Sequence, residues 1–165
     1  MTLELSEKLV NYQKKHPGIR LYALVNGLQY KRCFGEEINY IVGVNNPLFR
    51  HYPDSKLAFA GPWLFDMEYA RQWQEKLSTL EETYPAVSWL LTSLSLDKLT
   101  RHLVPYLNIQ LPTKQIALLR FYDPRILHRI SDIFSHEQLS AFTYDINKWV
   151  YQHNATYYSV SGAPL

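Results

Sequence analysis

Residues 86–93, with the sequence AVSWLLTS, constrain the fold of this chain more than any other segment. Their apolar side chains are nearly continuous and do not alternate with polar ones, which is typical of a strand that is buried on both faces of a sheet. A strand of this kind needs a layer of other elements on each side of its sheet. We therefore expect a β-sheet flanked by helices.

The rest of the chain switches between helical and strand spacing of its apolar residues, which predicts a mixed α/β fold. Further strands are expected at residues 19–26, 38–44, 61–67, 107–111 and 115–122, where β-forming residues lie between turn signals. Helices are expected before Pro17, through the stripe of Ala70, Trp73, Leu77 and Leu80, and from Leu96 to Tyr106 with Ser95 as the N-cap.

Strand signals nearly vanish after Tyr122. Residues 124–133 fit one helix, and Ser135 with Gln138 forms a capping box that opens a second helix. The apolar face of that second helix is expected to hold Leu139, Phe142, Ile146 and Trp149. The chain is therefore predicted to be one two-lobed unit, with an α/β lobe over residues 1–122 and a smaller helical C-terminal lobe over residues 123–165. Residues 155–165 fit either a short edge strand or a frayed end.

The block LLRFYDPR, residues 118–125, holds the strongest candidate for a functional carboxylate, Asp123. It follows a strand and precedes Pro124, and proline is favoured at the first position of a helix. We therefore predict that Asp123 is an N-cap whose carboxylate accepts a hydrogen bond from the first helical turn. Arg120 is expected on the same strand face as Tyr122, at the junction of the lobes, and Arg125 is expected to pair with an acid in the first turn.

A catalytic role for Asp123 would need partners that the sequence does not supply. The six histidines show no H-x-x-x-H spacing, and the single cysteine, Cys33, allows no CxxC site, which argues against a metal centre. The sequence has no G-x-S-x-G elbow, no Walker loop and no G-x-G-x-x-G, so neither a catalytic residue nor a cofactor is predicted. A small hydrolase or transferase that uses Asp123 with Arg120 or Arg125 stays open as the alternative.

Charge and apolar content argue against several classes of partner. The chain has 17 Lys and Arg against 15 Asp and Glu, and no basic tract is dense enough to follow a nucleic-acid backbone. No run of 18 apolar residues is present, and the first residues are charged every few positions, so neither a membrane span nor a signal peptide is expected. One cysteine permits no internal disulfide, which suits a reducing cytoplasm.

Four blocks follow one another along the chain: LYALVNG (21–27), AGPWLF (60–65), LTRHLVPYLNIQLP (99–112) and LLRFYDPRIL (118–127). In this order they closely resemble the type VI secretion adaptor-chaperone family, often called Tec or Tap proteins, and the likeness extends over about residues 19–149. Its most specific piece is R-F-Y-D-P-R. One departure is Asn26, where the family usually carries aspartate; we expect the turn to survive, because Asn and Asp both favour turns.

The resemblance implies a cytoplasmic, non-enzymatic adaptor that binds a toxin effector and helps to load it onto the VgrG spike. It also implies that the two lobes hold an effector segment, either as an amphipathic helix in a groove or as a strand added to a sheet edge. The 13 tyrosines and 4 tryptophans suit a contact surface, and the candidate partner contacts are Arg120, Tyr122, Arg125 and Trp63. A structural subunit that self-associates through an exposed aromatic patch is a further alternative.

Overall fold

Six antiparallel strands form the central sheet of the computed structural model, which describes residues 1–50 and 54–160. They are β1 (Arg20–Asn26), β2 (Asn45–Pro47), β3 (Pro62–Asp66), β4 (Val87–Thr92), β7 (Ile146–His153) and β8 (Thr156–Ser159), in the spatial order β2-β3-β1-β4-β7-β8. Every neighbouring pair in that order is antiparallel. The α/β class predicted from the sequence is confirmed.

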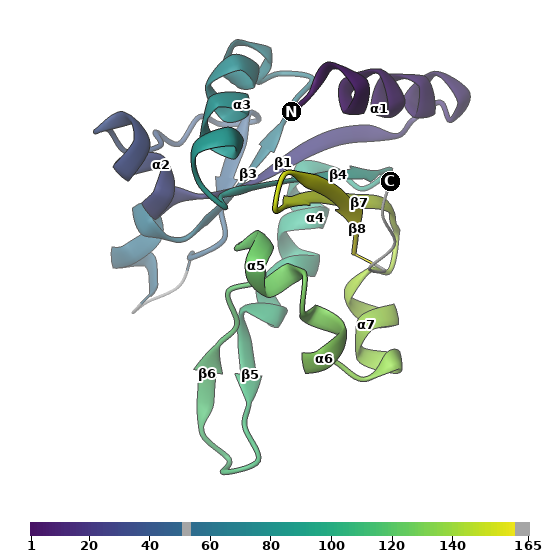
Figure 1. Ribbon diagram of the computed structural model, residues 1–165. Helices are drawn as coiled ribbons and strands as arrows, with labels where there is room; N and C mark the ends of the chain where they lie inside the picture. Colours follow the sequence, from purple (N-terminus) through teal and green to yellow (C-terminus); the bar gives the residue numbers. More distant parts are fainter. Residues whose placement is uncertain (51–53, 161–165) are drawn as a thin grey trace.

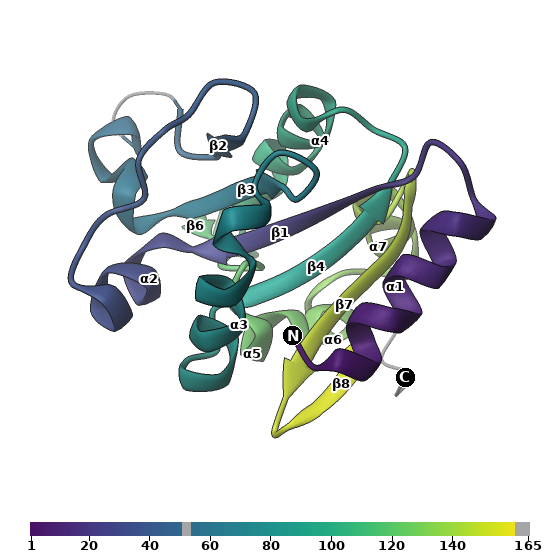
Figure 2. The same cartoon turned by 90° about the horizontal axis from the view of Figure 1, so that it is seen from above.

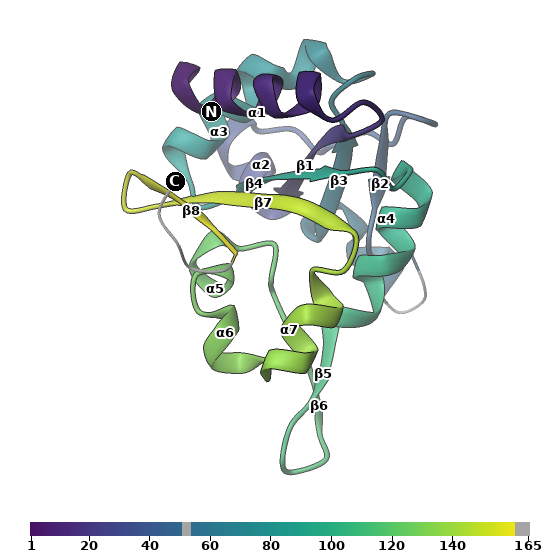
Figure 3. The same ribbon diagram turned by 90° about the vertical axis from the view of Figure 1, so that its right-hand side faces the viewer.

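Strand β4 lies inside this sheet, and all six of its residues are buried. Because successive side chains of a strand point to opposite faces, Leu90 packs into one core and Trp89 into the other. Figure 3 shows the layers: α1 (Leu3–Lys15) and α3 (Gln74–Thr83) on one face, and α4 (Leu96–Leu103), α5 (Pro124–Leu127), α6 (Ile130–Ile133) and α7 (His136–Phe142) on the other. The strand predicted to be buried on both faces is confirmed.

Shorter elements complete the two layers. Short 3-10 helices occupy Asp54–Ala60, Arg71–Trp73 and Val104–Leu107. Seen from above, α1 lies beside β7 and β8 (Figure 2), and the backbone N–H of Thr2 donates a hydrogen bond of 3.2 Å to the hydroxyl of Tyr157. None of the helices in the described part of the chain combines the length and the apolar composition needed to cross a membrane.

Helix α2 (Gly27–Phe34) follows β1 directly and was not predicted from the sequence. Asn26 is its N-cap: the side-chain oxygen of Asn26 accepts hydrogen bonds from the backbone N–H groups of Leu28, at 3.1 Å, and Gln29, at 3.3 Å. Asparagine therefore caps the helix as aspartate would. The turn that was expected to survive the replacement of aspartate by asparagine is present.

The strand predicted at residues 38–44 is wrong. The side chain of Asn45 organises this segment as a loop, because its oxygen accepts from the N–H of Ile41 at 2.9 Å and its amide donates to the carbonyl of Asn39 at 3.0 Å. Gly43 then takes a positive φ of 77° in a turn, a conformation that glycine adopts readily. These local bonds satisfy backbone groups that a strand would have given to a neighbour.

The helical C-terminal lobe predicted over residues 123–165 is wrong in its last part. Helix α7 ends at Phe142, the turn after it places Asp145 at a φ of 60°, and β7 and β8 then join the central sheet next to β4. Ile146 and Trp149, expected on a helical face, lie in β7, where the indole N–H of Trp149 donates to the hydroxyl of Ser88 at 3.0 Å. The apolar residues there are 3 and 4 positions apart, which predicts a helix. Pairing of β7 with β4 instead satisfies the backbone hydrogen-bonding groups of both strands.

The helices before α7 are shorter than the sequence predicts, whereas the start of α7 is as predicted. Residues 124–133 form two short helices, α5 and α6, with a break at His128 and Arg129, so the single predicted helix is wrong. The capping box is confirmed, because Ser135 and Gln138 exchange the two expected hydrogen bonds. The tail, left open as edge strand or frayed end, forms the edge strand β8; its last residues, 161–165, lie outside the described part of the chain.

Candidate functional site

Asp123 begins helix α5, as predicted. Its backbone is extended, with φ −92° and ψ 117°, and its Oδ1 accepts a hydrogen bond of 2.9 Å from the N–H of Arg125. Pro124 is the first helical residue, where its missing N–H costs nothing. The prediction that Asp123 is an N-cap is confirmed.

The guanidinium of Arg125 occupies both oxygens of the same carboxylate. Its Nε donates to Oδ1 of Asp123 at 3.0 Å and its Nη2 donates to Oδ2 at 2.7 Å. This two-pronged contact raises the pKa of Arg125, because the hydrogen bonds and the negative charge of Asp123 favour the protonated form. The expected pairing of Arg125 with an acid in the first turn is confirmed, and Asp123 is buried with its oxygens engaged.

Arg120 and Tyr122 do not share a strand face, so that expectation is wrong. Strand β6 (Ile116–Leu118) ends before them, and the N–H of Asp123 donates to the carbonyl of Arg120 at 2.9 Å in a turn. Alternation of side chains is lost in this turn, because both Phe121 and Tyr122 point into the core while Arg120 is exposed. Burial raises the pKa of Tyr122, and the positive charge of Arg120 opposes that rise.

Trp63 and Tyr122 lie on opposite faces of the central sheet. Trp63, on β3, belongs to the core beneath α1 and α3, and its indole N–H donates to the carbonyl of Ala58 at 3.0 Å. Tyr122 belongs to the core beneath α4–α7, with its ring edge-on to that of Phe49 at 6.5 Å. Both side chains are buried, so the structure does not bring these two candidates together on one surface. Their role as partner contacts stays a prediction.

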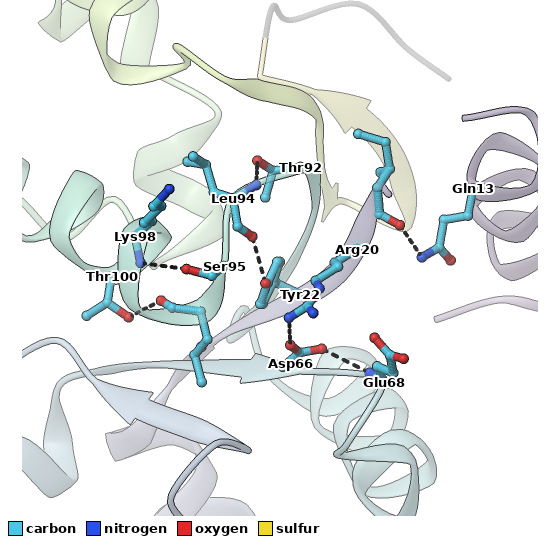
Figure 4. A network of polar contacts seen from close by, with 12 residues as sticks. Gln13, Arg20, Tyr22, Asp66, Glu68, Thr92, Leu94, Ser95, Lys98 and Thr100 are labelled. Carbon is cyan, nitrogen blue, oxygen red and sulfur yellow. Dashed lines mark hydrogen bonds and ion pairs between the residues drawn. The ribbon is translucent and has the colours of Figure 1, made fainter. Parts of the chain in front are cut away.

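A polar network at one end of the sheet is a second place where chemistry could occur (Figure 4). Asp66 on β3 is buried; its Oδ2 accepts from Nη1 of Arg20 at 3.2 Å and its Oδ1 accepts from the N–H of Glu68 at 3.1 Å. The hydroxyl of Tyr22 donates to the carbonyl of Leu94 at 2.8 Å. Burial raises the pKa of Asp66, and burial together with the charge of Asp66 raises the pKa of Tyr22 to about 12.

The contacts in this network tie elements together. Arg20 and Tyr22 come from β1 and Asp66 comes from β3, while Leu94 lies between β4 and α4. A pocket of about 630 Å³ lies beside Arg20 and Glu68, between them and helix α1. Within the described ranges no group of three or more His, Cys, Asp or Glu side chains could hold a metal ion. The network is therefore best understood as an ion pair between the buried Asp66 and the partly exposed Arg20, with its hydrogen bonds.

The hairpin of β5 (Asn108–Gln110) and β6 forms a surface that the sequence analysis did not identify. It projects from the α4–α7 face of the molecule (Figure 1). Three of its apolar side chains are exposed: Ile116 at 75%, Leu118 at 42% and Leu111 at 37%. On neighbouring α6, Ile133 is 41% exposed. Exposed apolar side chains that gather in one region mark interaction sites more often than single ones do.

A pocket of about 420 Å³, here called the β5 pocket, separates this hairpin from α6 and α7. It is lined by Pro105, Tyr106, Asn108, Ile109, Gln110, Ile133, Phe134 and Gln138. The apolar wall of the pocket thus comes from residues 105–109 and from residues 133–134, and its polar groups come mainly from β5. The signal for the hairpin was present as alternation in NIQ and QIAL around Pro112-Thr113-Lys114, but the alternation could not show which face would stay uncovered.

Comparison with known families matches residues 21–141 to the family model described as a domain of unknown function, DUF4123. The match covers well over half of the chain. The chain belongs to the DUF4123 family. No curated protein and no solved structure matches it.

The DUF4123 match contains both the R-F-Y-D-P-R block and the β5–β6 hairpin. It begins within β1 and ends within α7, so α1, β7 and β8 lie outside it. The central sheet nevertheless includes β7 and β8, which pair beside β4. In this chain the DUF4123 region is therefore completed by strands that follow it in the sequence.

Proposed function

We propose that this chain is a cytoplasmic adaptor that binds a type VI secretion toxin effector and promotes its loading onto the VgrG spike. The observation that carries the proposal is membership of the DUF4123 family, which is associated with type VI secretion effector adaptors. The four sequence blocks that resemble the adaptor-chaperones lie within or at the edge of the matched residues. The adaptor acts by binding, and no catalytic residue is assigned to it.

The state of Asp123 supports a binding role over the hydrolase or transferase alternative. A catalytic carboxylate needs an oxygen free to reach a substrate or to take up a proton. Here Oδ1 of Asp123 accepts from the N–H and Nε of Arg125, and Oδ2 accepts from its Nη2. Asp123, the acid that the alternative would use, and Arg125, one of its two candidate arginines, are therefore bonded to each other at the start of helix α5.

The exposed apolar side chains of the hairpin support the same proposal. A chaperone of this kind covers apolar surface of its client, which would otherwise aggregate. Ile116 and Leu118 offer exposed apolar area on β6, and Ile133 offers it at the β5 pocket. Such a surface fits a protein partner better than it fits a small polar substrate.

The test is co-expression with the toxin encoded beside this gene, followed by affinity capture of the chain. We expect a stable soluble complex, a higher yield of the toxin, and recovery of the spike protein from the native cytoplasm. Deletion of the gene should stop delivery of that toxin and leave delivery of unrelated toxins unchanged. Recovery of neither toxin nor spike protein, with unchanged delivery in the deletion strain, would contradict the proposal.

A further inference from the structure

Two histidines stack where the break between α5 and α6 meets the end of β7. His128 follows the last residue of α5, and His153 is the last residue of β7. Their ring centroids lie 4.1 Å apart, and the planes of the two rings differ by 15°. Figure 3 shows α5 lying beneath β7 and β8. The ring pair therefore joins the helical layer to the C-terminal hairpin of the sheet.

The hydroxyl of Tyr151 determines which form of His128 fits this arrangement. Tyr151 is fully buried, and among the described residues its hydroxyl has one hydrogen-bond partner, Nδ1 of His128 at 3.2 Å. A buried hydroxyl donates its hydrogen to an acceptor, so Nδ1 accepts this bond. The neutral imidazole with its hydrogen on Nε2 meets that requirement, whereas a protonated imidazole carries a hydrogen on both nitrogens.

A positive charge on this ring pair has two costs. The first arises at His128, where a hydrogen on Nδ1 leaves the buried hydroxyl of Tyr151 without an acceptor for its own hydrogen. The second arises from the stack, because two protonated rings place like charges in rings whose centroids are 4.1 Å apart. Burial lowers the pKa of His153 from its ordinary value of 6.5, and the charge of His128 lowers it further.

The charges on neighbouring elements do not offset a charged ring pair. Besides the two histidines, the titratable side chains of α5 with its cap, the break, α6, β7 and β8 are Asp123, Arg125, Arg129, Asp132, Lys148, Tyr151, Tyr157 and Tyr158. The two acids already contact Arg125 and Arg129. Lys148 and Tyr157 face the other side of the sheet, toward α1 and α3. Within the described ranges no carboxylate bonds to either imidazole.

We propose that His128 and His153 form a proton-sensitive latch, which holds the α5–α6 break against the β7–β8 hairpin when both rings are neutral and releases it when they become charged. Because the pKa of His153 is lowered in the folded chain, the stability that its neutral ring contributes is complete above pH 6.5 and is lost as the pH falls through the lowered value. Release loosens α6, whose Ile133 lines the β5 pocket. The latch is a property of the chain alone and does not depend on the proposed function.

Three glutamine variants test this proposal. His128→Gln and His153→Gln each remove one ring that can become charged, and a glutamine at residue 128 still offers an amide oxygen to the hydroxyl of Tyr151. His136→Gln is the matched control, because His136 is exposed at the start of α7 and, in the part of the chain that the structure describes, its ring stacks on no other. The probe is the proton, and the readout is backbone amide hydrogen exchange, corrected for the intrinsic rate at each pH.

In the parent chain we expect the protection of amides 126–130 and 150–152 to fall about tenfold between about pH 7.5 and about pH 5.5, where histidine takes up its proton. Protection in β1 and β3 should fall less than about twofold over the same range. His128→Gln and His153→Gln should each reduce the fall at the latch to less than about threefold, and His136→Gln should leave it unchanged. In an NMR titration, removal of the neighbouring charge in His128→Gln should move the titration of His153 to higher pH.

Protection at the latch that does not change with pH in the parent chain would overturn the proposal. An equal fall in β1 and β3 would also overturn it, because the acid would then unfold the whole chain and not one seam. The same holds if both latch variants kept the pH dependence of the parent, or if the titration of His153 were unchanged in His128→Gln. If His128→Gln did not fold, the exchange of the parent chain and of His153→Gln would decide the question.

Discussion

Replacing Asp123 by alanine removes two separate contributions to the stability of the folded chain. The first is the cap, a hydrogen bond of 2.9 Å from the N–H of Arg125 to Oδ1, for which about 0.5 to 2 kcal/mol is usual. The second is the ion pair with the Arg125 side chain, which is 59% exposed, so that water screens it to at most about 1 kcal/mol. Asp123→Ala should therefore lower the free energy of unfolding by about 0.5 to 3 kcal/mol.

In a chain of this size each kcal/mol corresponds to a change in melting temperature of about 2–4 °C. Thermal unfolding at neutral pH should thus show Asp123→Ala melting about 1–12 °C below the parent. Asp123→Asn keeps the side-chain oxygen that caps the helix and loses only the ion pair. Arg125→Ala also keeps the cap, because the backbone N–H of residue 125 remains, and loses the same ion pair. Each variant should therefore cost less than about 1 kcal/mol. If asparagine were as destabilising as alanine, the capping argument would be refuted. If Asp123→Asn kept its melting temperature but lost the toxin, the carboxylate would have a further role.

Three further perturbations have outcomes that the structure predicts. Gly27→Ala should cost about 2–3 kcal/mol in urea unfolding, because a Cβ there would lie 2.1 Å from the carbonyl oxygen of Phe59; unchanged stability would contradict this close approach. Trp63→Ala should cost about 3–5 kcal/mol as a buried core residue, whereas loss of the toxin with an unchanged melting temperature would make Trp63 a contact. Tyr22→Phe should destabilise the chain at neutral pH by about 1 kcal/mol through the lost bond to Leu94. Because the pKa of Tyr22 is raised to about 12 in the folded chain, from an ordinary value of 10.0, the stability it contributes is complete below pH 10 and is lost as the pH rises toward 12. The difference in unfolding free energy between the parent and Tyr22→Phe should narrow over that pH range. If the difference stayed constant, ionisation of Tyr22 would not be the cause of the pH dependence.

Local rules in the sequence were sufficient for two helix caps and for the buried strand β4. Asp123 before Pro124, and Ser135 with Gln138, determine helix starts because each cap is made by atoms within three residues of one another. The continuous apolar run of β4 likewise required cover on both faces, and that cover is present. The four sequence blocks used for the resemblance also lie within residues 21–141, which the DUF4123 family model matches.

Local side-chain bonds that composition does not reveal decided one part of the remainder, and partners distant in the sequence decided the rest. Residues 38–44 have the composition of a strand, but Asn45 holds them as a loop, and residues 146–149 have a helical spacing, but β4 was available to pair with them. The sequence did not decide whether the candidate contacts Trp63 and Tyr122 are surface or core residues, and the structure places them in two cores on opposite faces of the sheet. The stacking of His128 on His153 could not be foreseen either, because it depends on how α5 and β7 meet in the fold. The sequence by itself determined the starts of α5 and α7 and the burial of β4, since these depend on neighbouring atoms and on apolar area. Only the tertiary structure decided which strands pair and which surface stays exposed, because pairing and exposure depend on competition among segments far apart in the chain.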